Sequence, residues 1–158
     1  MTSPTKRISA SKAQNIGKPL IGALLRIPRE HVVLRMLTAV NEQGFDVSAT
    51  ELSVFMYPGP QGQRPIELAR RCNMSRQAMN YVLVELERRD YIKRHAGPTA
   101  ASAVVHMTEH GASMLKLMRN CVEVVEMEWM EHLGRPRFNA LKDALMDLSV
   151  WLGKTNGA

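Results

Sequence analysis

The chain has 158 residues, of which 45% are hydrophobic, so it is long enough to bury the core of one domain. No apolar run approaches the roughly 20 residues that a membrane-spanning helix needs. The net charge of +6 is uneven, because residues 1–19 and residues 64–95 each carry +4 and the remainder carries −2. This distribution is typical of a protein that binds nucleic acid.

Residues 1–19 are polar, basic and aperiodic, and we expect them to form a disordered tail. They lack the apolar segment of a secretory signal, which favours a cytoplasmic protein. The tail either grips DNA phosphates as a basic arm or is inert, and both interpretations stay open.

Residues 20–45 are expected to be helical, because their apolar side chains recur at helical spacing. These side chains are Leu20, Ile21, Leu24, Leu25, Val32, Val33, Met36, Leu37 and Val40. Pro28 should begin a second segment or kink one long helix, and Gly44 should end it.

Residues 46–63 predict a short buried helix followed by a linker. Ser48 and Glu51 have the spacing of a capping box, in which each side chain bonds to the backbone of the other residue. The apolar residues of this helix are Leu52, Phe55 and Met56. Residues 58–60, Pro-Gly-Pro, must terminate it, and the linker should continue through Gly62.

Residues 64–89 predict a helix-turn-helix. Pro65 suits the first position of a short helix, and Asn73 tolerates the left-handed backbone that a tight turn requires. Ser75 is a good N-cap for a second helix that extends to Arg89. The buried face of this second helix is expected to contain Met79, Val82, Leu83 and Leu86. A short helix, a turn and a longer helix in this order are typical of DNA-binding proteins.

The opposite face of the second helix carries side chains suited to reading DNA. Its residues are Arg76, Gln77, Asn80, Tyr81 and Val84. Arginine, glutamine and asparagine can form bidentate hydrogen bonds to base edges in the major groove, and valine can contact a thymine methyl group. A solvated polar face is the alternative interpretation of the same pattern.

Two β-prone segments, residues 91–95 and 103–107, follow this helix and predict a β-hairpin. A hairpin directly after a recognition helix is the wing of a winged helix. We expect Lys93 and Arg94 in the first strand, together with Ser75, to position the DNA backbone.

Residues 108–133 and 137–153 predict two C-terminal helices that are separated by a break at 134–136. Thr108 is the expected N-cap, and two apolar rows on the first helix make an arc wider than one neighbour requires. The second helix carries a seam with 3-4 spacing, formed by Phe138, Leu141, Leu145, Leu148 and Leu152. Such faces favour a homodimer, and a monomeric helical core is the alternative.

The whole pattern resembles the MarR (multiple antibiotic resistance regulator) family over residues 20–153. The motifs that carry the resemblance are Glu67-Leu68-Ala69, Leu86-Glu87, Tyr91-Ile92-Lys93-Arg94 and Met107-Thr108-Glu109-His110-Gly111. The family's wing usually contains Asp-x-Arg, but Thr99 and Ala101 occupy the matching positions here. The resemblance implies a mainly α fold with a small β-hairpin wing, in which a winged helix-turn-helix joins a helical dimerisation bundle.

The resemblance also implies an arrangement of domains and a function. Residues 20–45 and 113–153 would build the dimer, and residues 46–112 would bind DNA. The implied function is that of a ligand-responsive repressor, a nucleoid-associated homodimer on a pseudo-palindromic operator. It would have no catalytic activity, cofactor or metal. The alternative function is a winged-helix module that binds proteins rather than specific DNA.

The cysteines and histidines raise two other possibilities, an oxidant sensor and a metal site. Cys72 and Cys121 fall on apolar helix faces, which favours buried, inert thiols over oxidant sensors. His95, His106 and His110 cluster around the hairpin, but they lack the spacing and accompanying ligands of a metal site.

Overall fold

The computed structural model describes residues 18–56, 59–97 and 103–155. The expected tail falls mostly on residues 1–17, and Thr99 and Ala101 of the wing also lie outside the described residues. The elements are α1 (Ile21–Glu42), α2 (Ala49–Phe55), β1 (Gln61–Gln63), α3 (Pro65–Arg71), α4 (Arg76–Arg88), β2 (Ile92–His95), β3 (Val104–Met107), α5 (Glu109–Leu133) and α6 (Arg135–Thr155). A mainly α fold with a small sheet is therefore confirmed.

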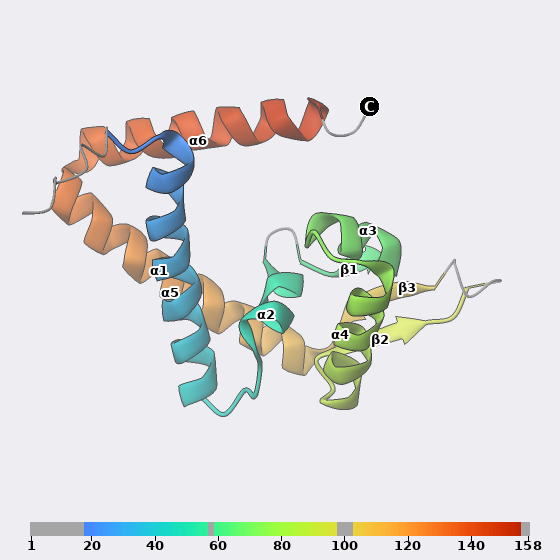
Figure 1. Ribbon diagram of the computed structural model, residues 1–158. Coiled ribbons are helices and arrows are strands. Elements are labelled where there is room, and N and C mark those ends of the chain that lie inside the picture. The colour runs from blue at the N-terminus through green and yellow to red at the C-terminus, as the bar shows by residue number, and fades with distance from the viewer. Residues whose placement is uncertain (1–17, 57–58, 98–102, 156–158) are drawn as a thin grey trace, which may run out of the picture.

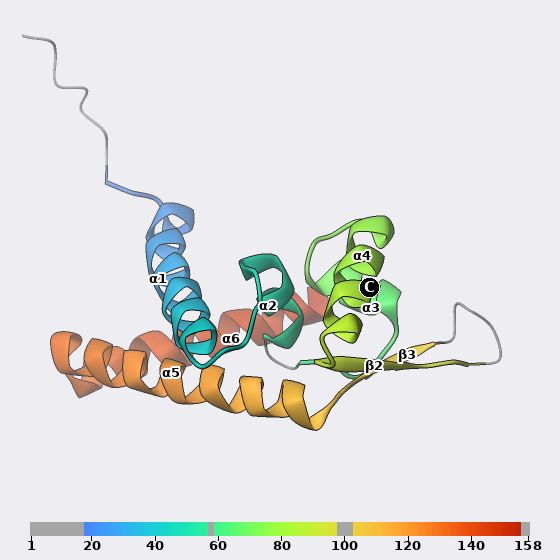
Figure 2. The ribbon, with the colours of Figure 1, turned by 90° about the horizontal axis from the view of Figure 1, so that it is seen from below.

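The elements form a head and a set of long helices (Figure 1). The head contains α3, α4 and the sheet, with α2 beside it, and α5 leads away from it toward α1 and α6. Seen from below, the strands lie beneath α4 and α5 extends as a long rod that α1 crosses (Figure 2). Among the described residues, no helix is long and apolar enough to cross a membrane.

The helix-turn-helix forms as predicted. Pro65 occupies the first turn of α3, and Asn73 has φ 53°, so the turn uses the left-handed conformation that asparagine tolerates. The Ser75 hydroxyl accepts a hydrogen bond from the backbone N–H of Ala78 at 3.1 Å, which caps α4. The predicted inner face of α4 is buried in the core of the head: Met79, Val82, Leu83 and Leu86.

The sheet has one more strand than the hairpin prediction allowed. β2 and β3 pair antiparallel, with Arg94 opposite Val105, and β1 pairs with the other edge of β3. The expected linker through Gly62 is therefore wrong, because residues 61–63 form a strand. Gly62 has φ 79°, and the pairing is irregular around it. The strand has only three residues, none of them apolar, so it lacks the alternating pattern that would identify a strand.

Helix α1 is a single long helix, which is one of the two alternatives that Pro28 left open. Pro28 lies within α1, which is one helix from Ile21 to Glu42. Residues 21–30 are exposed, so α1 packs on the rest of the chain only through its C-terminal half. There Met36 and Val40 are buried, and Arg35 forms a bidentate ion pair with Glu128 of α5, at 2.9 and 3.0 Å.

The start of α5 is packed closely against the backbone of Tyr91, which lies between α4 and β2. The hydroxyl of Thr108 accepts from the backbone N–H of Gly111 at 3.0 Å, which confirms the predicted cap. The backbone N–H of Thr108 donates to the carbonyl of Tyr91 at 3.2 Å. A Cβ on Gly111 would lie 2.1 Å from that same carbonyl oxygen. Only glycine allows this approach, which sets how the head meets α5.

Helix α6 leaves most of its apolar seam uncovered. It begins immediately after Gly134, at the predicted break. Phe138 is only 7% exposed, but the rest of the seam is exposed: Leu141, Leu145, Leu148 and Leu152. Figure 1 shows α6 extending from the far end of α5, apart from the head. The N-terminal half of α1 also exposes leucine and isoleucine side chains, so two unpartnered apolar faces lie at the same end of the molecule.

Candidate nucleic-acid interface

The outer face of α4 presents every side chain that the sequence assigned to DNA reading. All five residues are exposed: Arg76, Gln77, Asn80, Tyr81 and Val84. Tyr81 carries a large aromatic ring and is 70% exposed. Because the opposite face of α4 is buried, the helix is held rigidly with these side chains outward. An exposed helix face of this composition can enter a major groove.

Ser75, Lys93 and Arg94 flank this face in different ways. Ser75 is exposed at the N-terminus of α4, where its hydroxyl serves as the helix cap. Lys93 is exposed on β2, so its ammonium is free to approach a phosphate. Arg94 is half-buried and already has partners within the chain.

Arg94 connects β2 to α4. Its Nε donates to Glu87 at 2.7 Å, its backbone N–H donates to the same carboxylate at 2.9 Å, and its Nη1 donates to Oδ1 of Asn80 at 3.2 Å. Burial raises the pKa of Glu87, but the hydrogen bonds from Arg94 outweigh this effect, so the net pKa lies below its ordinary value. The sequence predicted only a contact between Arg94 and the DNA backbone, and these bonds within the chain were not predicted.

Two further arginines, Arg71 and Arg89, hold the segments of the head together, and neither was predicted from the sequence. Arg71 of α3 donates to the carbonyls of Val54 at 2.7 Å and Gly59 at 3.2 Å, which fastens the end of α2. Arg89 donates to the carboxylate of Glu51 and to the backbone carbonyl of Asp46. Both arginines join segments distant in sequence, and local patterns do not reveal such pairs.

The cysteines lack the features of redox sensors. Both are half-buried, and the Sγ–H of Cys72 donates to the backbone carbonyl of Ser53 at 3.7 Å. Burial raises the pKa of the Cys121 thiol, which disfavours the reactive thiolate.

The histidines fall into two separate groups. The rings of His95 and His106 meet edge to face across the hairpin, with centroids 5.2 Å apart. His110 instead stacks on both Phe45 and Tyr91, with ring centroids 4.9 Å from each, and these two rings are themselves 6.1 Å apart. No group of three or more metal-ligating side chains occurs in the part of the chain that the structure describes.

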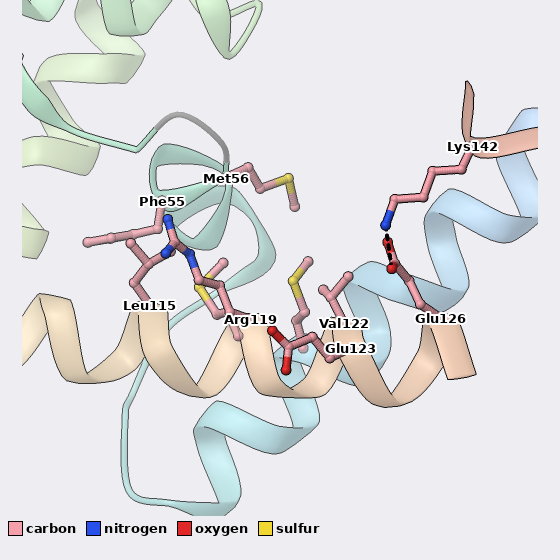
Figure 3. A pocket seen from close by; sticks show the side chains of 10 residues that line it. Phe55, Met56, Leu115, Arg119, Val122, Glu123, Glu126 and Lys142 are labelled. Carbon is pink, nitrogen blue, oxygen red and sulfur yellow. Dashed lines mark hydrogen bonds and ion pairs between the residues drawn. The ribbon is translucent and has the colours of Figure 1, made fainter. Parts of the chain in front are cut away.

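A cavity of about 480 Å³ lies between α2 and the long helices (Figure 3). Its walls are mostly apolar, with Phe55 and Met56 from α2 facing Leu115 of α5. The guanidinium of Arg119 extends from α5 toward Phe55, and Lys142 of α6 closes the far end through an ion pair with Glu126 at 2.6 Å. An apolar cavity with a few charged groups is suited to an organic ligand that bears a charge.

Comparisons with known proteins bear on the fold. No protein-family model matches the sequence, and no curated protein does. Among solved structures, the transcriptional repressor CouR bound to a 23-mer DNA duplex matches with TM-score 0.61 at 22% identity, covering 82% of this chain and 92% of that one. A MarR family protein of Mycobacterium tuberculosis in complex with DNA matches with TM-score 0.60 at 21% identity, covering 83% of this chain and 98% of its own.

This chain has the MarR fold. The M. tuberculosis protein also matches when it is in complex with salicylic acid, with TM-score 0.60 at 23% identity, over 83% of this chain and 97% of that one. CouR is a transcriptional repressor, and another of the matching structures is a MarR family transcription regulator. The mainly α winged-helix fold that the sequence motifs implied is therefore confirmed.

Proposed function

We propose that this chain is a sequence-specific double-stranded DNA-binding transcriptional regulator, a repressor that acts as a homodimer on a pseudo-palindromic operator. The observation that carries the proposal is the outer face of α4, on which Arg76, Gln77 and Asn80 are exposed on a helix whose other face is buried. MarR-fold neighbours bound to DNA duplexes support it. In this role the protein works in the cytoplasm, on the nucleoid, without catalysis or a cofactor.

Each proposed contact has a distinct task. Arg76, Gln77 and Asn80 read base edges, and Tyr81 and Val84 contact phosphate or a thymine methyl group. Ser75, Lys93 and Arg94 set the position of the DNA backbone, and such contacts carry little sequence information themselves.

The homodimer follows from the apolar faces that the chain leaves exposed. The seam of α6 and the N-terminal half of α1 would lose solvent contact against a second copy of the chain. Two α4 helices would then face successive major grooves, about one helical turn of DNA apart.

Fluorescence anisotropy tests this function. The purified protein is titrated into its own upstream promoter DNA and into a scrambled duplex of equal length, across a series of salt concentrations. We expect promoter binding to be tighter by about 10³-fold or more, with a steep decline as salt increases. Equal, weak binding to both duplexes would contradict the proposal and favour a winged-helix module that binds proteins.

Regulation by a small molecule is the second part of the proposal. A ligand in the cavity would contact α2 of the head and α5 of the helical bundle together, so it could change the spacing of the two heads. Arg119 forms no hydrogen bond or ion pair with any described residue, and its charge favours an anionic ligand. Salicylate is a suitable probe, since a MarR-fold neighbour is solved in complex with salicylic acid.

Calorimetric titration with salicylate tests the cavity, with Arg119→Met as the variant and Lys116→Met as the control. Both residues are exposed on α5, but only Arg119 lines the cavity. We expect Arg119→Met to weaken binding by about tenfold, since a charge-assisted hydrogen bond contributes ~1.5–3 kcal/mol. Equal affinity in the two variants would show that the ligand binds elsewhere.

A further inference from the structure

Asn80 has a partner within its own chain that restricts what it can offer to a base. Nη1 of Arg94 donates to Oδ1 of Asn80 at 3.2 Å. A guanidinium has only N–H donors, so the atom of the amide that faces Arg94 must be the oxygen. The NH₂ group of Asn80 is left as the available donor on the exposed face of α4.

Arg94 is itself held in place by Glu87. Its Nε and backbone N–H donate to the carboxylate at 2.7 and 2.9 Å, and its Nη2 lies 2.6 Å from Oε2. The side chains of Arg94 and Glu87 are only 28% and 34% exposed. Two ends of the planar guanidinium are therefore engaged at once, which orients the third nitrogen toward Asn80.

This arrangement changes the base that asparagine would prefer. Asparagine reads adenine with both halves of its amide, because the oxygen accepts from N6 and the NH₂ donates to N7. In this chain the oxygen already accepts a charge-assisted bond. An adenine amino group would have to share that oxygen with a cationic donor, whereas the acceptors of guanine and thymine need only the NH₂ group.

We propose that Arg94 is a positioning residue that makes Asn80 a donor-only reader, so that the base contacted by Asn80 is guanine or thymine rather than adenine. The inference rests on the proposed DNA-binding function and adds a specificity that the residue type alone would not predict. Arg94→Met or Arg94→Lys should then leave the amide oxygen of Asn80 available to accept from the adenine amino group, because neither side chain can bond to Glu87 and Asn80 in the way that the planar guanidinium does.

Selection of bound duplexes from a randomised pool, followed by sequencing, tests the inference. The wild type is compared with Asn80→Ala, Arg94→Met, Arg94→Lys and the control Arg88→Met. Arg88 lies on α4, as Asn80 does, but it pairs with Glu85 at 2.9 Å and forms no hydrogen bond with Asn80. Positions at which Asn80→Ala loses preference identify the base pairs that Asn80 reads.

At those positions we expect the wild type to favour guanine or thymine over adenine by about tenfold, within the ~1–3 kcal/mol of one base contact. Both Arg94 variants should raise the frequency of adenine among the selected duplexes by a similar factor, and Arg88→Met should leave that frequency unchanged. Arg94→Lys keeps the positive charge but not the planar guanidinium, so it distinguishes positioning of Asn80 from simple attraction to phosphate.

Three results would overturn the inference while leaving the proposed function intact. They are a wild-type preference for adenine, an Asn80→Ala variant with unchanged preferences, and Arg94 variants that weaken all sequences equally. If the wild type enriches no sequence at all, the proposed function fails and the inference fails with it.

Discussion

Gly111 shows how a single residue sets the junction between the head and α5. A Cβ at this position would meet the Tyr91 carbonyl oxygen at 2.1 Å, and that oxygen is backbone, which cannot move aside cheaply. The same carbonyl accepts the backbone N–H of Thr108 at 3.2 Å, so shifting it would also disturb the start of α5. Glycine is required here by close packing rather than by its backbone angles.

Gly111→Ala should destabilise the protein by about 2–3 kcal/mol, since overpacking a tight site forces the backbone to shift. Urea unfolding followed by circular dichroism measures the change. Gly22→Ala is the matched control, because Gly22 is also helical but a Cβ there would meet nothing within 4 Å. A stability equal to that of the wild type in Gly111→Ala would show that the junction is looser than described.

Glu51 links a helix cap to the frame of the head. Its carboxylate accepts from the backbone N–H of Ser48 at 2.8 Å and pairs with Arg89, which directly follows α4. Burial raises the pKa of Glu51, but the hydrogen bonds from Ser48 and Arg89 outweigh it and hold the net pKa below its ordinary value. Because the folded-state pKa is depressed, this carboxylate stabilises the fold above the unfolded pKa of about 4.3.

That contribution should be lost as the pH falls through the folded-state pKa. Glu51→Gln should lower the free energy of unfolding at pH 7 by about 1–2 kcal/mol, because the half-buried guanidinium of Arg89 loses its charged partner. Glutamine at this position can keep the capping box. The variant should also lose less stability than the wild type between about pH 5 and pH 3. Parallel pH profiles of unfolding would contradict this role. Glu30→Gln, in an exposed pair with Arg26, is the control.

Helix α4 and strand β2 differ in the kind of DNA contact that they are proposed to make. Lys93→Ala on β2 should weaken binding to all sequences alike and reduce the salt slope by about one, as the loss of one phosphate contact requires. Gln77→Ala on α4 should reduce promoter binding by about 1–3 kcal/mol and leave the salt slope unchanged. Anisotropy across a salt series distinguishes them, and an unchanged slope for Lys93→Ala would remove its assigned role.

Local signals predicted the elements well where one residue decides the local structure. The caps Ser75 and Thr108 and the left-handed residue Asn73 were all predicted from residue type and position. Strand β1 was missed because three polar residues carry no period, and it exists only through its pairing with β3.

The candidate site was also predicted only in part. The outer face of α4 follows from helical spacing, because the buried positions determine which side chains must be exposed. The bond from Arg94 to Asn80 joins a strand to a helix, and the bonds from Arg71 fasten a distant loop. These contacts depend on tertiary packing, which residue spacing does not encode.

At the scale of the whole molecule, the exposed apolar seam of α6 needs a partner. Leu145 lies within the seam and is 37% exposed in the single chain. Leu145→Glu would bury a charge in the proposed dimer, and should raise the dimer dissociation constant by about 100-fold or more, equivalent to ~3 kcal/mol.

Analytical ultracentrifugation measures the change in the dimer, and Asn139→Glu supplies a control at an exposed polar position of the same helix. The loss of the dimer should also weaken operator binding, since one head alone retains only half of the contacts. A Leu145→Glu protein that remains dimeric at the same concentration would show that this seam is not the interface.

In the proposed function, one dimer must present two α4 helices to the DNA together. Hydroxyl-radical footprinting on the promoter duplex measures whether it does. We predict two protected patches related by two-fold symmetry, with centres about 10–10.5 base pairs apart. A single protected patch, or uniform protection along the duplex, would contradict the account.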